Sequence, residues 1–491
     1  MTQRERPLGV DPALPVPRPP GKKTLDKDLN KLTALGIGVV FLALVWWFSA
    51  LQTGDGAGGA FIILAGIVGG YMALNIGAND VANNVGPAVG ARALTMMGAL
   101  AIAAVFETLG ALLAGGEVVA TVSKGIIDPT RFESSEVFIT AMLAALFAAA
   151  LWVNLATYVS APVSTTHAIV GGVMGAGIAT AGFGVVAWGT MAKIAASWLI
   201  SPLLGGAIAA LFLACIRVAI IYQDDKIAAA KRWVPVLVAL MAGVFSAYLV
   251  MKGLKRVWTP DLRLVALIGL AVFAGAYVAI KPLVARRAEG MENRTESVRS
   301  LFTVPLICSV ALLSFAHGSN DVANAVGPLS AIVGAVGSGD ISAKVEIPLW
   351  VMLIGAAGIS LGLVLFGPKL VRRVGQEITK MNPMRAFCVA LSAAITVILA
   401  SALGLPVSST HIAVGAIFGV GFFREYFSTR RLRRPDTDKK TAGNGNNNGE
   451  IVRRRKLVRR SHLMTIVAAW VITVPATALL AAGLFFAFNA L

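Results

Sequence analysis

Stretches of about twenty apolar residues recur almost from end to end of this chain, and they limit its fold more than any other feature. Each stretch is long enough to cross the ~30 Å hydrocarbon core of a bilayer as a helix. Only 14% of the residues are charged, whereas about a quarter are charged in a soluble domain. Backbone groups in lipid must be satisfied internally, so we expect an all-α integral membrane protein, a helical bundle of about 11–13 spans.

The chain carries a net charge of +18, and its placement indicates membrane topology rather than a nucleic-acid partner. Lys and Arg gather in the N-terminal arm and in the connecting segments 281–299, 369–385 and 424–460. The positive-inside rule places such segments on the cytoplasmic face. We therefore expect a multi-pass protein of a bacterial-type inner (plasma) membrane with a cytoplasmic N-terminus, and no nucleic-acid binding.

Two motifs occur twice, in the same order, and they indicate an internal duplication. GANDVANNVGP at 77–87 returns as GSNDVANAVGP at 318–328, and PVSTTH at 162–167 returns as PVSSTH at 406–411. The second copies follow the first by 241 and 244 residues, so whole units are duplicated. Under the topology above, the first Asn-Asp motif enters from outside and the second from inside. Inverted-topology repeats of this kind bind their substrate at the repeat interface, on helices that are interrupted in both halves.

This duplication defines the expected organisation of the chain. Segments 162–182 and 406–423 are short, glycine-rich and polar at their starts, so we expect hairpin-like helices there, re-entrant or half-length. The expected segments are a cytoplasmic N-terminal tail over 1–32, an extra first transmembrane helix over 33–60, the first repeat unit over 61–221, a central transmembrane pair with a basic cytoplasmic loop over 222–300, the second repeat unit over 301–424, a basic low-complexity cytoplasmic loop over 425–461, and a C-terminal transmembrane helix over 462–491.

Asp80 and Asp321 are carboxylates inside otherwise apolar segments, and neither motif contains Lys or Arg. A charge at the bilayer centre costs about 2.5–3.5 kcal/mol on insertion scales, so it normally faces a cavity and a partner. The natural partner is a mobile cation, Na⁺ or H⁺, with Na⁺ as the metal ion expected at Asp80 and Asp321. Asn79 and Asn320 add amide oxygens for a hard cation. The alternative is that these buried amides only cap broken helices.

Each PVS[ST]TH motif begins with a proline followed by hydroxyl side chains, which is typical of a helix start. A helix N-terminus offers free N–H groups and about half a positive charge, so it can bind an anion. Two such ends converging from opposite halves would hold a tetrahedral oxyanion without arginine. The alternative is ordinary N-capping. The candidate anion-binding residues are Ser164, Thr165, Thr166, Ser408, Ser409 and Thr410, with amide donors from Asn83 and Asn324.

Three of the four histidines, His167, His317 and His411, lie in or beside these motifs. A proton relay is one interpretation. Histidines that fix the hairpins by hydrogen bonding are the more common case, and we therefore assign none of them to the site.

The paired motifs resemble those of the inorganic phosphate transporter (PiT) family of secondary carriers over about residues 61–182 and 301–423. Membership would imply an inverted-repeat helical fold and import of phosphate with Na⁺ or H⁺. Glu107, in Phe-Glu-Thr-Leu-Gly, resembles a family glutamate associated with cation coupling. Sodium-coupled relatives carry another glutamate in the helix before the second Pro-Val-Ser, where this chain has Ala390. This departure leads us to expect uptake to depend more on pH than on Na⁺.

The resemblance implies a symporter that imports inorganic phosphate by alternating access, with no cofactor. Sulfate or another tetrahedral oxyanion is the alternative substrate, and an anion channel would also use helix ends but would not need three buried acids. The chain has no phosphate-binding Gly-rich loop with lysine and no pairing of nucleophile with base, so we expect it not to be an enzyme. The expected partners are inorganic phosphate, Na⁺ or H⁺ and the lipid bilayer, and both a monomer and a homo-oligomer remain open.

Overall fold

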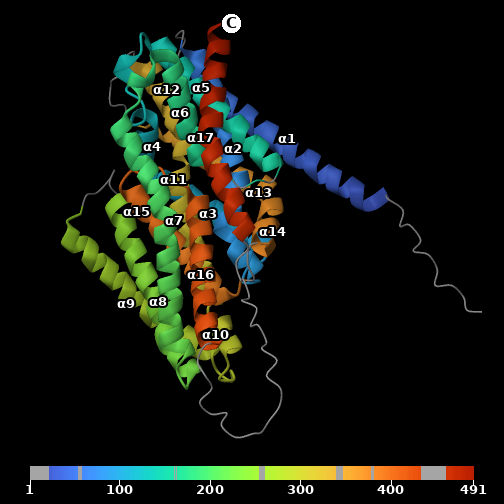
Figure 1. Cartoon of the computed structure of the whole chain (residues 1–491), viewed down its shortest axis with the longest axis vertical. Coiled ribbons are helices and arrows are strands. Elements are labelled where there is room, and N and C mark those ends of the chain that lie inside the picture. The colour runs from blue at the N-terminus through green and yellow to red at the C-terminus, as the bar shows by residue number, and fades with distance from the viewer. Residues whose placement is uncertain are drawn as a thin grey trace, which may run out of the picture.

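A computed structural model describes residues 21–53, 58–159, 161, 163–253, 260–338, 347–377, 381–432 and 460–490. These residues form an elongated bundle whose helices run mostly along the long axis (Figure 1). Apart from the isolated antiparallel bridge between Ile127 and Val186, the described regular structure is helical. Eleven helical segments of the described chain are long and apolar enough to cross a membrane, which confirms the expected all-α membrane class.

The first repeat unit contains six α-helices that alternate between long spans and shorter pieces. Its polar hairpin turn lies between α5 and α6, over residues 159–164, of which Ser160 and Pro162 lie outside the described residues. The helices are α2 (Gly59–Gly90), α3 (Met96–Ala114), α4 (Gly116–Lys124), α5 (Ser135–Tyr158), α6 (Thr165–Ala181) and α7 (Trp188–Ile216), which continues as a π-helix over Arg217–Ile221.

The second unit repeats this order, with its hairpin turn over residues 403–408. The final helix, α17, packs against α5 and α6 of the first unit, just as α7 packs against α15 and α16 of the second. It therefore takes the place in the second unit that α7 has in the first. The helices are α11 (Thr303–Asp321), α12 (Ala323–Ser338), α13 (Leu349–Phe366), α14 (Pro368–Glu377), α15 (Pro383–Ala402), α16 (Ser409–Leu432) and α17 (Arg460–Asn489).

The two units are interleaved, because the helices of each pack mainly on helices of the other. The motif helix α2 contacts α13, and its counterpart α11 contacts α3. Glycines permit this close packing: a Cβ on Gly77 would lie 2.0 Å from the Ile359 carbonyl oxygen, and one on Gly318 would lie 2.1 Å from that of Glu107. In Figure 1, α10, α11 and α12 follow one another from the lower to the upper end of the bundle.

The expected interruption of both Asn-Asp helices is only partly present. Helix α2 continues through the whole first motif, and the second helix breaks at the single residue Val322, between α11 and α12. The glycine and the polar side chains of the first motif need no break in the backbone, because Gly77 serves close helix packing and the polar groups bond to neighbouring helices. The larger interruptions lie at the two hairpin turns.

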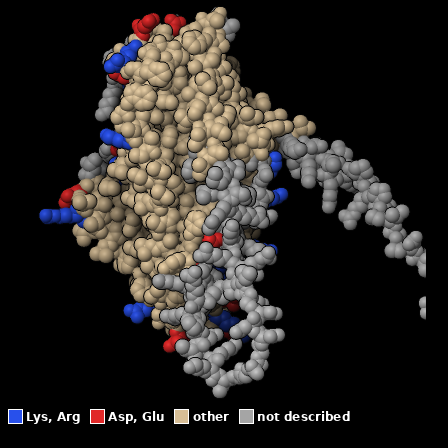
Figure 2. Space-filling model, viewed as in Figure 1, with Lys and Arg blue, Asp and Glu red and all other residues tan. Residues whose placement is uncertain are grey.

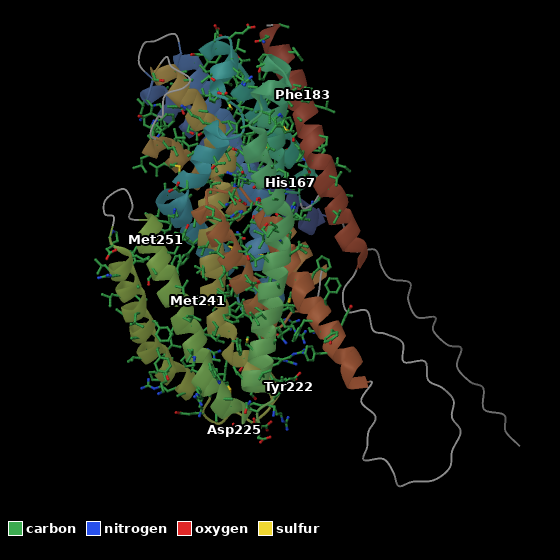
Figure 3. The ribbon with its side chains drawn as sticks, turned by 60° about the vertical axis from the view of Figure 1, so that its left-hand side comes forward. His167, Phe183, Tyr222, Asp225, Met241 and Met251 are labelled. Atoms are coloured by element: carbon green, nitrogen blue, oxygen red, sulfur yellow. The ribbon has the colours of Figure 1, made fainter. Side chains whose placement is uncertain are left out.

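Four further helices lie outside the duplicated pattern. Helix α1 packs on α2 and α13, while α8 and α9 pack mainly on each other, with Gly243 and Gly269 at their crossing. Only 6% of the apolar window of α9 is buried, as expected for a lipid-facing helix. In Figure 3, this pair rises from Asp225 at the lower end only as far as Met251. The four are α1 (Gly21–Leu51), α8 (Lys226–Tyr248), α9 (Leu262–Arg287) and α10 (Thr295–Leu301).

The polar termini and loops differ in length from the expected segments. Helix α1 begins at Gly21, within the expected tail 1–32, and α16 extends to Leu432, within the expected loop 425–461. Residues 1–20 and 433–459 lie outside the described part of the chain. Most of the surface in Figure 2 is free of charged side chains, which lie near its ends and edges. This distribution agrees with a broad band in contact with lipid.

Candidate functional site

The two Asn-Asp motifs and the two hairpin turns meet in the interior of the bundle. Asp80 and Asp321 are each only 1% exposed. The turns touch directly, because the Thr166 hydroxyl donates a 2.9 Å hydrogen bond to the Val407 carbonyl. In Figure 3, His167 at the first turn lies between the levels of Phe183 near one end and Tyr222 near the other. The structure thus joins the four sequence motifs into one buried site.

Asp80 links both hairpins to the first motif helix. Its Oδ2 accepts a hydrogen bond of 2.9 Å from the Thr165 hydroxyl, and its Oδ1 accepts one of 3.0 Å from the Thr410 hydroxyl. Asp321 is held differently: its Oδ2 accepts a 2.8 Å bond from the Ser409 hydroxyl and lies 2.8 Å from His317 Nε2. The matching carboxylates therefore have unequal partners.

Asn83 and Asn324 each bond across to the opposite hairpin. The Asn83 amide donates to the Thr410 hydroxyl at 2.8 Å. The Asn324 amide donates to the hydroxyls of Thr165 at 3.2 Å and Thr166 at 3.1 Å. Both side chains thus contact hairpin hydroxyls that were predicted, together with them, to bind the anion.

Asn79 and Asn320 instead attach each hairpin to its own motif helix. The Asn79 amide donates to the Thr157 hydroxyl at 3.0 Å. The Asn320 amide donates to the Ser401 hydroxyl at 3.0 Å and the Leu405 carbonyl at 3.1 Å. The Asn320 side-chain oxygen also accepts from the Val407 N–H at 3.2 Å. These contacts position the hairpins, whichever ligand the site binds.

Ser164 and Ser408 act as N-caps of α6 and α16. The Ser164 hydroxyl accepts from the His167 N–H at 3.1 Å, and the Ser408 hydroxyl accepts from the His411 N–H at 3.3 Å. The capping alternative is therefore present at both sites. Helix starts still leave first-turn N–H groups without intrahelical acceptors, so the buried starts of α6 and α16 retain their capacity for an anion.

His317 and Asn84 lie at the centre of the candidate site, although neither was among the residues predicted for it. His317 Nδ1 lies 3.2 Å from Glu107 Oε1, and its Nε2 faces Asp321 at 2.8 Å and Asp80 Oδ2 at 3.9 Å. The Asn84 amide donates to Glu107 Oε1 at 2.8 Å. One imidazole therefore contacts all three buried acids, and its position just before the second motif was the available signal.

The site is asymmetric because Glu107, Asn84 and His317 have no polar counterparts in the other half. Gly318 packs on the backbone of Glu107, and Gly77 packs on the backbone of Ile359, so Ile359 occupies the position matching Glu107. The motif offset of 241 residues places Ala325 opposite Asn84 and Ile76 opposite His317. Ala390 is fully buried in the apolar core around α15. Within the duplicated site, the first half alone supplies this extra acid.

Several buried oxygens of the described site have no hydrogen-bond partner. Hard cations such as Na⁺ prefer oxygen ligands. Carboxylate oxygens of Asp80 and Asp321 also lie within 4.8 Å of one another and of a His317 nitrogen, a grouping able to hold a metal ion. The unpartnered atoms are Asn79 Oδ1, Asn84 Oδ1, Asn324 Oδ1, Glu107 Oε2 and Asp321 Oδ1.

Known proteins agree with this architecture. A family model described as "Phosphate transporter family" matches residues 76–481. A Helicobacter pylori protein named "Putative phosphate permease" is 46% identical, over 95% of this chain and 96% of its own length. A Pyrococcus abyssi protein of similar name is 35% identical, over 87% of this chain and 97% of its own length.

A solved structure described as "The sodium-dependent phosphate transporter" has the same fold. It aligns with a TM-score of 0.78 and 35% sequence identity, over 88% of this chain and 100% of its own. The family match covers both motif pairs and both hairpins, and the relatives are matched over almost their full length. This chain therefore belongs to the phosphate transporter family and is a multi-pass membrane transporter of phosphate, not an enzyme.

Proposed function

We propose that the chain imports inorganic phosphate together with Na⁺, by alternating access of its two units around the buried site. The observation that carries this proposal is the convergence of two helix starts and two carboxylates at one point. Helix N-termini attract the anion, whereas carboxylates attract the cation. The two charges then stabilise each other in a low-dielectric interior.

The anion binds where the starts of α6 and α16 meet. Hydroxyls of Thr165, Thr166, Ser409 and Thr410 and the amides of Asn83 and Asn324 surround this position, and most of them bond to each other or to a carboxylate in the present arrangement. Hydroxyls can exchange these bonds for bonds to a bound oxyanion by rotating. The anion thereby loosens the contact between the two hairpins.

Phosphate is favoured over sulfate by the acceptors in this site. Phosphate at neutral pH retains a P–OH hydrogen, whereas sulfate has none. The carboxylates of Asp80 and Asp321 can accept that hydrogen, and a buried acceptor without a donor is costly. A sulfate ion would offer these carboxylates only oxygen acceptors and no hydrogen to accept.

The coupling cation is held by the oxygens around Asp80, Asp321 and Glu107. Their unpartnered lone pairs support a hard cation, and the solved relative is described as sodium-dependent. Protons are the alternative: Ala390 led us to expect a stronger dependence on pH than on Na⁺, and His317 contacts all three acids. Separate Na⁺ and pH gradients distinguish the two.

The orientation rests on the positive-inside rule. It places the N-terminus and the lower end of Figure 1 in the cytoplasm and makes the two units an inverted-topology repeat in an inner (plasma) membrane. The α5–α6 hairpin then opens toward the outside and the α15–α16 hairpin toward the cytoplasm. Each provides one gate of the alternating-access cycle.

The test is radiolabelled phosphate uptake into proteoliposomes. Wild type should accumulate phosphate when an inward Na⁺ gradient is imposed, and excess sulfate should not compete. Asp80→Asn or Asp321→Asn should abolish accumulation, whereas Asp128→Asn, which changes an exposed loop acid that pairs with Arg131, should not. Full accumulation in both site variants would refute the symport proposal. Accumulation driven by a pH gradient alone would show that the coupling cation is H⁺ and not Na⁺.

A further inference from the structure

A cluster of four arginines lies near the lower end of the bundle, away from the central site. Arg217 follows α7 directly, Arg299 lies on α10, Arg385 on the first turn of α15, and Arg424 on α16. All four side chains are half-buried. In Figure 3, Tyr222, five residues after Arg217, marks this end of α7, well below His167. Helices α7, α15 and α16 pack on one another, and α10 contacts α15.

The four positive charges act on one another. Arg385 is subject to repulsion from Arg424, Arg299 and Arg217, and Arg424 to repulsion from Arg217 and Arg299. Guanidinium groups remain protonated in proteins, so this repulsion is not relieved by loss of a proton. Four helices therefore bring these positive charges together at the lower end of the bundle.

The described contacts of Arg217 and Arg299 compensate the charges of these two residues only in part. Arg217 lies over the rings of Phe423 and Phe427, 5.2 and 5.9 Å from their centroids, and these contacts hold its guanidinium without neutralising it. Arg299 pairs with Glu296, whose side chain is 77% exposed, at 3.1 Å. Its Nε is buried and has no hydrogen-bond partner among the described residues. That N–H remains available to a ligand.

We propose that Arg217, Arg299 and Arg424 form a second anion site that binds a phosphate group, with Arg385, which makes further contacts, completing the ring. Arginine suits this role because its planar fork of donors matches phosphate oxygens and its charge is weakly hydrated. The location on the cytoplasmic side rests on the proposed function and orientation, which make this the side where phosphate is released. Inorganic phosphate and the headgroup of an anionic lipid share this chemistry.

The experiment measures protection of the arginines from phenylglyoxal in nanodiscs that contain the full chain. Modification of Arg299 and Arg424 is followed by peptide mass spectrometry, with Arg286 and Arg287 at the end of α9 as internal controls. In phosphatidylcholine discs, inorganic phosphate should slow modification of the cluster but not of the controls. Arg424→Gln should raise the protecting concentration at Arg299 about tenfold, the effect of losing one charged hydrogen bond.

Two further arms identify the source of the phosphate group. Protection in phosphatidylglycerol discs without inorganic phosphate would assign it to a lipid headgroup. Protection by inorganic phosphate in phosphatidylcholine discs would assign it to the transported anion. Asp321→Asn should keep the protection even if it transports nothing, so failure of the central site is distinguishable from failure of this one. Absence of protection in both lipids, or equal protection by chloride at matched ionic strength, would overturn the proposal.

Discussion

The ionisable residues of the central site show how a duplicated sequence can produce unequal halves. Asp80 is held by hydroxyls from both hairpins, whereas Asp321 is held by one hydroxyl and by His317. Glu107 contacts the other ring nitrogen of His317, with its Oε1 3.2 Å from Nδ1. A symmetric pair of acids has thereby become a group of three carboxylates around one imidazole.

Replacing Glu107 by Gln should weaken cation coupling more than it weakens folding. The amide oxygen can still accept the bond from Asn84, but the negative charge beside His317 is lost. We expect the Na⁺ concentration for half-maximal uptake to rise about tenfold, which corresponds to about 1.4 kcal/mol of lost cation binding. Na⁺ activation curves measure this effect, with Glu133→Gln in an exposed loop as the control. An unchanged curve would show that Glu107 is structural.

The capping serines permit a separation of stability from binding. Ser164→Ala with Ser408→Ala should cost about 1 kcal/mol per lost cap and should also raise the KM for phosphate, because both helix starts lie in the site. Ser134 caps α5 away from the site, through a 3.3 Å bond from the Val137 N–H. Ser134→Ala should therefore lower the melting temperature without changing KM. If the double variant has the same KM as Ser134→Ala, then Ser164 and Ser408 serve only as helix caps.

At the scale of helices, glycine determines how closely the two units pack. Gly77→Ala and Gly318→Ala would each place a methyl group about 2 Å from a backbone oxygen of the neighbouring helix. The helices must then separate, at a cost of about 1–3 kcal/mol for overpacking. Uptake should fall sharply, because these positions lie within the Asn-Asp motifs.

The matched control for these variants is Gly275→Ala in α9, where a methyl group would meet nothing within 4 Å. It should change neither the melting temperature of the purified protein nor its uptake. Wild-type stability and transport in the Gly77 and Gly318 variants would show that the interface tolerates wider spacing.

At the scale of the whole molecule, the orientation of the two units is testable by cysteine labelling. In a chain with Cys215, Cys308 and Cys388 replaced by Ala, Ser134→Cys should react with an impermeant maleimide from outside intact cells. Gln223→Cys, exposed at the opposite end between α7 and α8, should react only after permeabilisation. The reverse pattern would invert the proposed topology and exchange the roles of the two hairpins.

The amino-acid sequence alone determined the class of this protein and identified most residues of the candidate site. Apolar runs reveal membrane helices because their length must match the bilayer, and the duplicated motifs identified the two aspartates and both hairpin starts. Each of these signals can be read within a short stretch of the chain, about 20 residues for a membrane helix and 6 or 11 residues for a motif.

Only the tertiary structure decided how the halves meet. It kept α2 continuous through its motif and exchanged α7 and α17 between the units. It also brought Asn83 to Thr410 and Asp80 to the same hydroxyl, across 327 and 330 residues. His317 and Asn84 joined the site for the same reason. Contacts across such separations depend on the packing of whole helices, and no local pattern encodes which side chains that packing will bring together.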